Sequence, residues 1–311
     1  MKRFIVRTRE GAFIGMIALS LVWGINWLVM KFALRDADPV TFNIQRILVA
    51  IATLFIVLVW LRRPLLPQSW VAVAVTGLFQ TTLNMGATTM ALAGGGAGRT
   101  SVLVFTMPFW TVLLAWPVLN ERVRGVQWFA VAFAFAGMAL VVEPWNWQGS
   151  LAPKLWAVAS GFGWAAGTIS IKYFERERKF DMVNFMAWQM VIGALPFIAL
   201  PLVYTLSPVH WSLAYASALL FTGAISTALG FVIWISVLRI VPAGTASLNT
   251  LAVPVVALLA SMAVFGERLS PLEWSGIACI NVGLVLVSLG AWRHNRRERR
   301  AADEPPPIEG S

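Results

Sequence analysis

Apolar residues fill most of the chain in runs of about 20, and short polar stretches separate these runs. A helix of that length matches the hydrocarbon thickness of a bilayer. None of the runs carries the continuous polar face that a helix on the surface of a soluble protein needs. We therefore expect an all-α membrane protein. Its ten predicted transmembrane helices cover residues 12–34, 40–60, 69–92, 98–117, 126–143, 153–172, 183–204, 211–238, 243–264 and 271–292.

Composition agrees with this pattern, because 59% of the 311 residues are hydrophobic and only 12% are charged. Soluble domains carry about 25% charged residues. The connections between the runs are short and leave no room for a soluble domain. The first run lacks the small-residue cleavage site of a signal peptide. The segment 293–311 is rich in Arg and then in Pro, and we expect a disordered cytoplasmic tail.

A repeated pattern divides the chain into two halves, 12–143 and 153–292. The first copy contains Gly98, Pro108, Glu121, Arg122, Trp128 and Gly137, and the second contains Gly244, Pro254, Glu267, Arg268, Trp274 and Gly283, each 146 residues later. Membrane proteins built from two similar halves around a central site are typically secondary transporters.

The distribution of Lys and Arg predicts the orientation. With the N-terminus inside, the inner segments hold 18 of the 24 basic residues and the outer segments hold four. The positive-inside rule then places both termini in the cytoplasm. Five helices per half is an odd number, so the second half enters the membrane inverted. The net charge of +10 is explained by this topology, and we expect a lipid bilayer rather than nucleic acid as the partner.

The repeat extends to further segments: 23–31 is similar to 164–172, and 45–50 to 188–193. With the doubled Pro, Glu-Arg, Trp and Gly pattern, these segments make residues 12–292 resemble the EamA-type drug/metabolite transporters, most of all the bacterial exporters of aromatic amino acids and metabolites. The resemblance implies a bacterial inner-membrane protein with a central cavity lined by helices one to four and six to nine. Helices five and ten would pack outside, often as a homodimer contact. Small residues in helix five permit close approach, within one chain or between two: Ala130, Ala132, Ala134, Ala136 and Gly137.

Arg46 is the strongest candidate for substrate binding. A charged residue well inside a span costs about 2.5–3.5 kcal/mol on insertion scales and should face a wet cavity or the protein interior. The alternative is that Arg46 extends along the helix to the outer surface. Its counterpart Gln189 in the second half is uncharged, so the site need not be electrically symmetric.

Aromatic residues on two corresponding helix faces suggest stacking on a planar solute or a cation. Four-residue spacing places Trp23, Trp27 and Lys31 on one face, and Trp164, Thr168 and Lys172 on the matching face. The alternative is an interfacial belt for Trp, with the two lysines reaching the surface.

Polar residues complete the predicted cavity, although bonds between helices explain such residues equally well. They are Asn26, Asn84, Thr88, Gln189, Ser226 and Asn249. Arg99 begins a helix at the outer mouth, where it attracts a substrate carboxylate or only marks the helix end. Pro108 and Pro254 sit at matching positions, and each removes a backbone hydrogen bond, as a hinge or as a fixed kink.

No Asp, Glu or His is expected at membrane depth, so we predict no metal, no cofactor and no proton relay. An intramembrane enzyme would need clustered nucleophiles, acids or metal ligands. The sequence therefore favours an exporter of small solutes, amino acids above all, that works downhill by alternating access. The alternatives are a proton-coupled carrier of drugs or cations and, less favoured, a channel.

Overall fold

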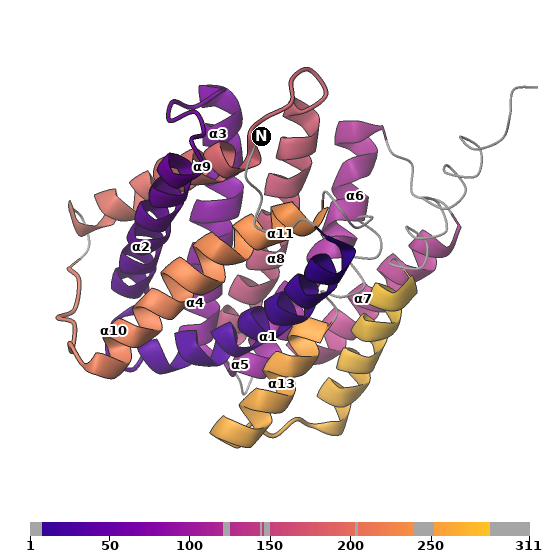
Figure 1. Cartoon of the computed structure of the whole chain (residues 1–311). Coiled ribbons are helices and arrows are strands. Elements are labelled where there is room, and N and C mark those ends of the chain that lie inside the picture. Colours follow the sequence, from indigo (N-terminus) through magenta and orange to yellow (C-terminus); the bar gives the residue numbers. More distant parts are fainter. Residues whose placement is uncertain are drawn as a thin grey trace, which may run out of the picture.

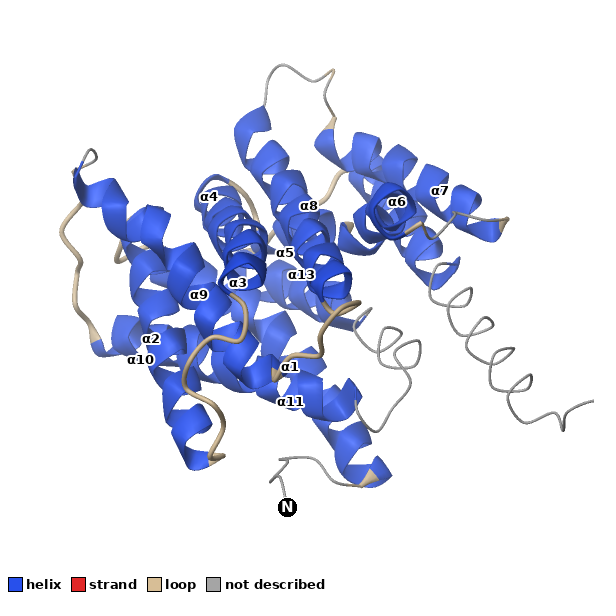
Figure 2. Cartoon of the chain, turned by 90° about the horizontal axis from the view of Figure 1, so that it is seen from above, coloured by secondary structure: helices blue, strands red, loops and turns tan. Residues whose placement is uncertain are grey.

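The computed structural model describes residues 8–120, 125–143, 145, 150–202, 205–238 and 252–286, and every regular element in these ranges is helical (Figures 1 and 2). Five helices are long and apolar enough to cross a membrane, namely Glu10–Ala33, Pro39–Trp60, Ala97–Leu119, Met182–Leu202 and Leu213–Trp234. Shorter apolar helices are Trp128–Val142, Ala252–Phe265 and Pro271–Leu286. The all-helical prediction is confirmed for these residues, and the number of ten spans stays a prediction.

The first half contains α1 (Arg9–Ala33), α2 (Pro39–Trp60), α3 (Trp70–Gly77), η1 (Leu78–Leu83), α4 (Asn84–Gly94), α5 (Ala97–Val104), α6 (Met107–Leu119) and α7 (Val126–Val142). The second half contains α8 (Leu151–Phe174), α9 (Met182–Ala199), η2 (Leu200–Leu202), α10 (Leu213–Leu220), η3 (Phe221–Leu229), α11 (Gly230–Leu238), α13 (Ala252–Phe265) and the helix Pro271–Leu286.

Aspartates start two of the membrane helices. The Asp38 carboxylate accepts bonds from the backbone N–H groups of Val40 and Thr41, and Pro39 follows it as the first helical residue. Asp181 does the same for Val183 and Asn184 at the start of α9. A carboxylate satisfies N–H groups that have no partner inside the helix, which fixes where the helix begins.

A π-helical segment interrupts one long helix in each half. The segment η1 separates α3 from α4, and η3 separates α10 from α11. Residues 70–94 and 213–238 are helical without a gap, so the helices predicted over 69–92 and 211–238 are present, and the π-segments are a feature within them. π-segments change the direction of side chains beyond them and are frequent at functional sites.

The break between α5 and α6 lies directly before Pro108. Because proline has no N–H and its ring crowds the preceding turn, α5 ends at Val104 and α6 begins at Met107. Pro254 lies in the first turn of the described part of α13. Whether these two prolines act as hinges stays a prediction.

Small residues bring α7 and the helix Pro271–Leu286 together in one chain (Figure 1). A methyl group on Gly137 would lie 2.4 Å from the carbonyl oxygen of Gly276, and one on Gly283 would lie 2.8 Å from that of Ala130. Residue 130 corresponds to 276 and residue 137 to 283, so each half makes the same contact on the other. The small-residue face of helix five is thus occupied within the chain, and it gives no support to a homodimer.

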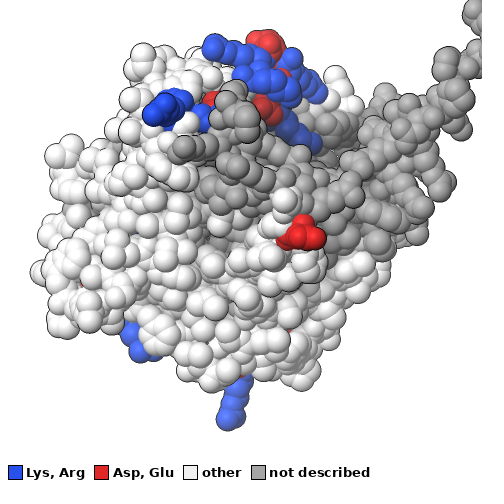
Figure 3. All heavy atoms as spheres, in the orientation of Figure 1, with Lys and Arg blue, Asp and Glu red and all other residues white. Residues whose placement is uncertain are grey.

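Charged side chains gather at one end of the face shown in Figure 3, where Lys and Arg predominate, and the broad middle of that face carries almost none. This distribution is typical of a chain that crosses a membrane. The predicted tail 293–311 and the predicted cavity residue Asn249 lie outside the described residues.

Candidate functional site

Arg46 is buried inside the protein. Its side chain is 3% exposed, with Nη1 2.6 Å from the sulfur of Met30 on α1 and Nη2 2.9 Å from Oδ1 of Asn43. Its guanidinium carbon lies 5.7 Å from the ring centre of Phe42. The alternative that Arg46 reaches the outer surface is therefore wrong. Among the described residues no carboxylate forms an ion pair with this guanidinium.

Three buried polar atoms of α1 and α2 have no hydrogen-bond partner among the described residues. They are Nε of Arg46, Nδ2 of Asn43 and Oδ1 of Asn26, and we name Asn26, Asn43 and Arg46 the central polar group. A buried polar atom without a partner costs about 1–3 kcal/mol. Such atoms persist when a ligand that is absent from the free protein supplies the bond.

Aromatic rings cluster around Trp23, which lies one turn before Asn26 on α1. Trp23 donates from Nε1 to the carbonyl oxygen of Ser226 at 3.0 Å. Its ring centre lies 6.4 Å from that of Phe231, and the Trp164 ring stacks on Phe231 at 5.6 Å. The corresponding tryptophans of the two halves thus meet around one phenylalanine. Trp27 is buried in the apolar core, against which Trp23 also packs.

Several other predicted cavity residues bond to neighbouring helices. Asn84 donates to the carbonyl and hydroxyl oxygens of Ser160, both at 2.9 Å, and Thr88 lies 2.7 Å from the same hydroxyl. Thr81 donates to Gln189 at 3.0 Å. Thr168 donates to the carbonyl of Trp164 one turn earlier. Bonds within and between helices account for these side chains.

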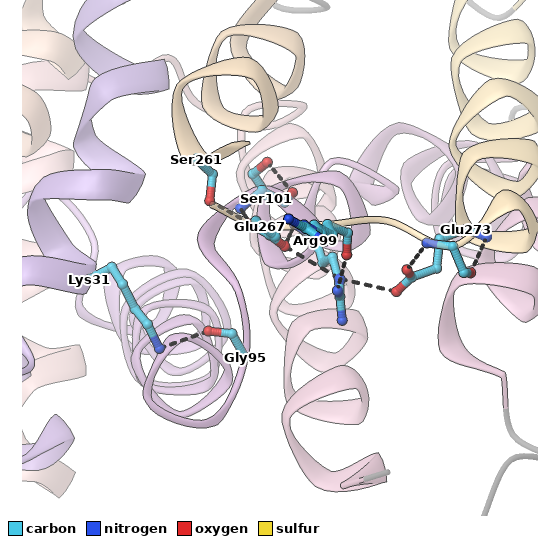
Figure 4. Close-up of polar contacts among 10 residues, drawn as sticks. Lys31, Gly95, Arg99, Ser101, Ser261, Glu267 and Glu273 are labelled. Carbon is cyan, nitrogen blue, oxygen red and sulfur yellow. Dashed lines mark hydrogen bonds and ion pairs between the residues drawn. The ribbon is translucent and has the colours of Figure 1, made fainter. Parts of the chain in front are cut away.

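A cluster of paired charges holds the beginning of α5 (Figure 4). The Glu267 carboxylate accepts bonds from the backbone N–H of Gly98 at 3.0 Å and of Arg99 at 3.2 Å, and also from the Ser261 hydroxyl. The Arg99 Nε lies 3.4 Å from Glu267 and 3.0 Å from Glu273. We name Gly98, Arg99, Ser261, Glu267 and Glu273 the Glu267 clamp.

A model of the EamA-like transporter family matches the chain twice, at residues 11–143 and 152–289. The two matches correspond to the two halves seen in the sequence. The chain belongs to the EamA-like transporter family. It is therefore a transporter rather than an enzyme, and a multi-pass membrane protein.

Several relatives of this EamA protein are known by name. The uncharacterized transporter YoaV of Bacillus subtilis (strain 168) is 27% identical over 79% of this chain and 85% of its own. A probable amino-acid metabolite efflux pump of Salmonella typhimurium (strain LT2) is 25% identical over 91% of this chain and 96% of its own. A protein of the same description from Escherichia coli (strain K12) is also 25% identical, over 90% and 96%. One crystal structure, 18% identical, shares the fold with a TM-score of 0.63 over 92% of this chain and 99% of that chain.

One expectation about charged residues of this EamA protein is corrected by the structure. The side chains of Glu267 and Glu273 are each 7% exposed, so buried carboxylates are present, although they lie at helix ends. Lys31 is partly buried, and its Nζ donates to the carbonyls of Leu92 and Gly95 at the end of α4, at 2.6 and 2.8 Å. Arg99 is held by its own carboxylates rather than left free for a substrate.

Gln80 was missed by reasoning from the sequence. It is 5% exposed, and its Oε1 has no partner among the described residues. It lies in η1 and is the counterpart of Ser226 in η3, 146 residues later. Comparing the two halves position by position would have identified it. Among the described residues no group of three His, Cys, Asp or Glu side chains is placed to hold a metal ion.

Proposed function

We propose that this protein exports small solutes, namely amino acids, aromatic ones above all, and related metabolites, from the bacterial cytoplasm by alternating access. The two halves, 12–143 and 153–292, would form inverted five-helix units of a ten-span protein with both termini in the cytoplasm. Relatives described as probable amino-acid metabolite efflux pumps support amino acids as the substrate class. The contacts that each half repeats on the other support an axis between the halves.

The buried Arg46 carries this proposal. An uncompensated charge in the interior is costly, and a carboxylate is the partner that a guanidinium binds best. Every amino acid carries one. The rings of Trp23, Trp164 and Phe231 add a surface on which a flat side chain stacks.

Transport of L-phenylalanine by protein reconstituted in liposomes tests the proposal. Arg46→Met keeps the volume of the side chain and removes its charge. A bond to a charged group contributes about 1.5–3 kcal/mol, so we expect transport to fall roughly 10- to 100-fold. Because none of the described carboxylates pairs with this charge, thermal stability should stay equal or rise.

Arg46→Lys is the matched control, since it keeps a positive charge but loses the planar pair of donors. We expect it to retain part of the transport. If Arg46→Met carries L-phenylalanine at the parent rate, the assigned role is wrong. If it also lowers thermal stability strongly, Arg46 supports the fold rather than the substrate.

A second candidate is a proton-coupled carrier of drugs or cations, and the buried carboxylates Glu267 and Glu273 favour it. We nevertheless propose downhill transport, because both carboxylates are engaged by Arg99 and by N–H groups. In liposomes, a pH gradient alone should not drive accumulation of a solute whose charge does not change with pH. Accumulation that collapses with the pH gradient favours the second candidate, and Glu267→Gln would then abolish it.

Orientation can be tested separately, with reporter fusions after Ser150 and at the N-terminus. The proposed topology places Ser150 outside and the N-terminus inside. A fusion at Ser150 that reports a cytoplasmic position contradicts the inverted arrangement, and it leaves the substrate proposal standing.

A further inference from the structure

One face of α1 contacts aromatic rings at one point and the buried arginine at another. Trp23 on this face bonds to Ser226 of η3, and Met30 contacts the guanidinium of Arg46. Asn26 lies three residues after Trp23 and four before Met30. Residues at these spacings are neighbours on a helix face, with Cβ atoms about 5–6 Å apart. Asn26 therefore lies between the aromatic rings and the cation.

The hydrogen-bonding groups without a partner in the central polar group differ in kind. Arg46 Nε and Asn43 Nδ2 are donors, and Asn26 Oδ1 is an acceptor. The Asn43 amide cannot be turned the other way at no cost, because its oxygen already accepts from Nη2 of Arg46 at 2.9 Å. The two donors can bind a carboxylate. The acceptor cannot, because an ionised carboxylate has no proton to donate. The acceptor suits an ammonium group.

The second half has no equivalent of this acceptor. Trp23 corresponds to Trp164, so Asn26 corresponds to Gly167. At Gly167 there is no room for a side chain, because a methyl group there would lie 2.9 Å from the Gln80 side chain. The arginine and the acceptor both belong to the first half, and a ligand that uses both is bound mainly by α1 and α2.

We infer that Asn26 accepts a hydrogen bond from the ammonium group of the solute, beside the carboxylate held by Arg46 and Asn43, so that the site selects zwitterionic amino acids over acids that lack the amine. This inference rests on the proposed function and deepens it. In the resulting arrangement the charged head lies at the central polar group, and an aromatic side chain points along α1 toward Trp23 and Phe231.

Two probes that differ by one group test the inference, namely L-phenylalanine and 3-phenylpropanoate, which lacks the ammonium group. The parent protein in liposomes should prefer L-phenylalanine. Asn26→Leu, of similar size, should lower the ratio of the two kcat/KM values roughly 10-fold or more, through the KM of L-phenylalanine. Transport of 3-phenylpropanoate should stay the same. An unchanged ratio, or an equal loss for both probes, would overturn the role of Asn26.

A second variant covers the case in which Asn26→Leu does not fold. Asn26→Asp adds a negative charge that attracts an ammonium group and competes for Arg46. It should raise transport of 2-phenylethylamine, which lacks the carboxylate, relative to L-phenylalanine. No gain for this amine contradicts the inference.

Controls separate this inference from the proposed function. Asn84→Leu removes a buried asparagine whose bonds to Ser160 are made inside the protein, and it should leave the ratio of the two probes unchanged. Arg46→Met should reduce both probes alike. A parent protein that carries neither probe, or full transport by Arg46→Met, overturns the proposed function. A loss with Arg46→Met and an unchanged ratio with Asn26→Leu overturns only the role of Asn26.

Discussion

Two arginines of the chain differ in burial and in their carboxylate partners. Arg46 is almost fully buried, and none of the described carboxylates pairs with it. Arg99 is about one-third exposed and faces two carboxylates. If burial of charge were only a matter of stability, the more buried arginine would have the better partners. The difference supports the proposal that the central polar group binds a solute, whereas the Glu267 clamp holds the helices of the protein together.

The Glu267 clamp joins parts that are distant in the sequence. The Glu267 carboxylate lies where the first turn of α5 presents backbone N–H groups that have no partner inside the helix. The partial positive charge of a helix start favours a negative group there. Gly96 allows this approach, because a side chain at that position would collide with the carboxylate. The clamp therefore fixes α5 against α13 and the helix Pro271–Leu286.

The largest expected effect on stability is at the clamp. Glu267→Ala removes the acceptor for two N–H groups, the Ser261 hydroxyl and Arg99, so we expect a loss of about 3 kcal/mol, measured as thermal unfolding in detergent. Glu10→Ala, which removes an exposed glutamate from the first turn of α1, should change stability little. A similar small loss for both variants would remove the contrast between clamp and central group.

A smaller loss is expected for Asn84, which makes its bonds inside the protein. Asn84→Ala leaves Ser160 without two donated bonds and should cost about 1–2 kcal/mol in the same assay. Asn26→Leu removes an atom that has no partner and should cost nothing. If Asn26→Leu destabilises the protein as much as Asn84→Ala does, then Asn26 has a structural partner after all.

The smallest predicted effect concerns the start of the helix Pro271–Leu286. The backbone N–H of Ser270 donates to Glu273, and that of Glu273 donates to the Ser270 hydroxyl, at 2.8 and 3.1 Å. Such a reciprocal pair stabilises a helix start, and Ser270→Ala should cost about 1 kcal/mol. Since Glu273 also pairs with Arg99, the double variant Ser270→Ala/Arg99→Ala should lose less than the sum of the two single losses if the clamp acts as a unit, because either change already weakens the contacts of Glu273. Simple additivity would show independent contacts.

Apolar runs were sufficient to predict the helices, because run length and polar boundaries determine where a membrane helix begins and ends. Wherever a described helix start can be compared with its predicted position, the two lie within three residues of each other, as in α1 and α2. The π-segments could not be predicted, since no residue type is reserved for them. The break before Pro108 followed from proline chemistry.

The site was predicted less completely. Burial of Arg46 followed from its depth in a span, but its contacts with Met30 and Asn43 depend on how α1 packs against α2. The clamp was not foreseen, because Glu267 meets residues that lie 168 and 169 positions earlier in the chain. A carboxylate near a predicted helix end gives no local sign that its neighbours will bury it.

The two π-segments lie at matching positions in the two halves of the chain. The segment η1 ends at Leu83 and η3 ends at Leu229, and these residues are 146 positions apart, which is the distance between the two copies of the repeated pattern. A π-segment arises when one residue is inserted into an α-helix. Its presence at matching places in both copies is what one insertion before gene duplication produces. The repeat therefore includes this irregular turn of the backbone, so the two halves differ in side chains such as Asn26 and Gly167 while they share the turn.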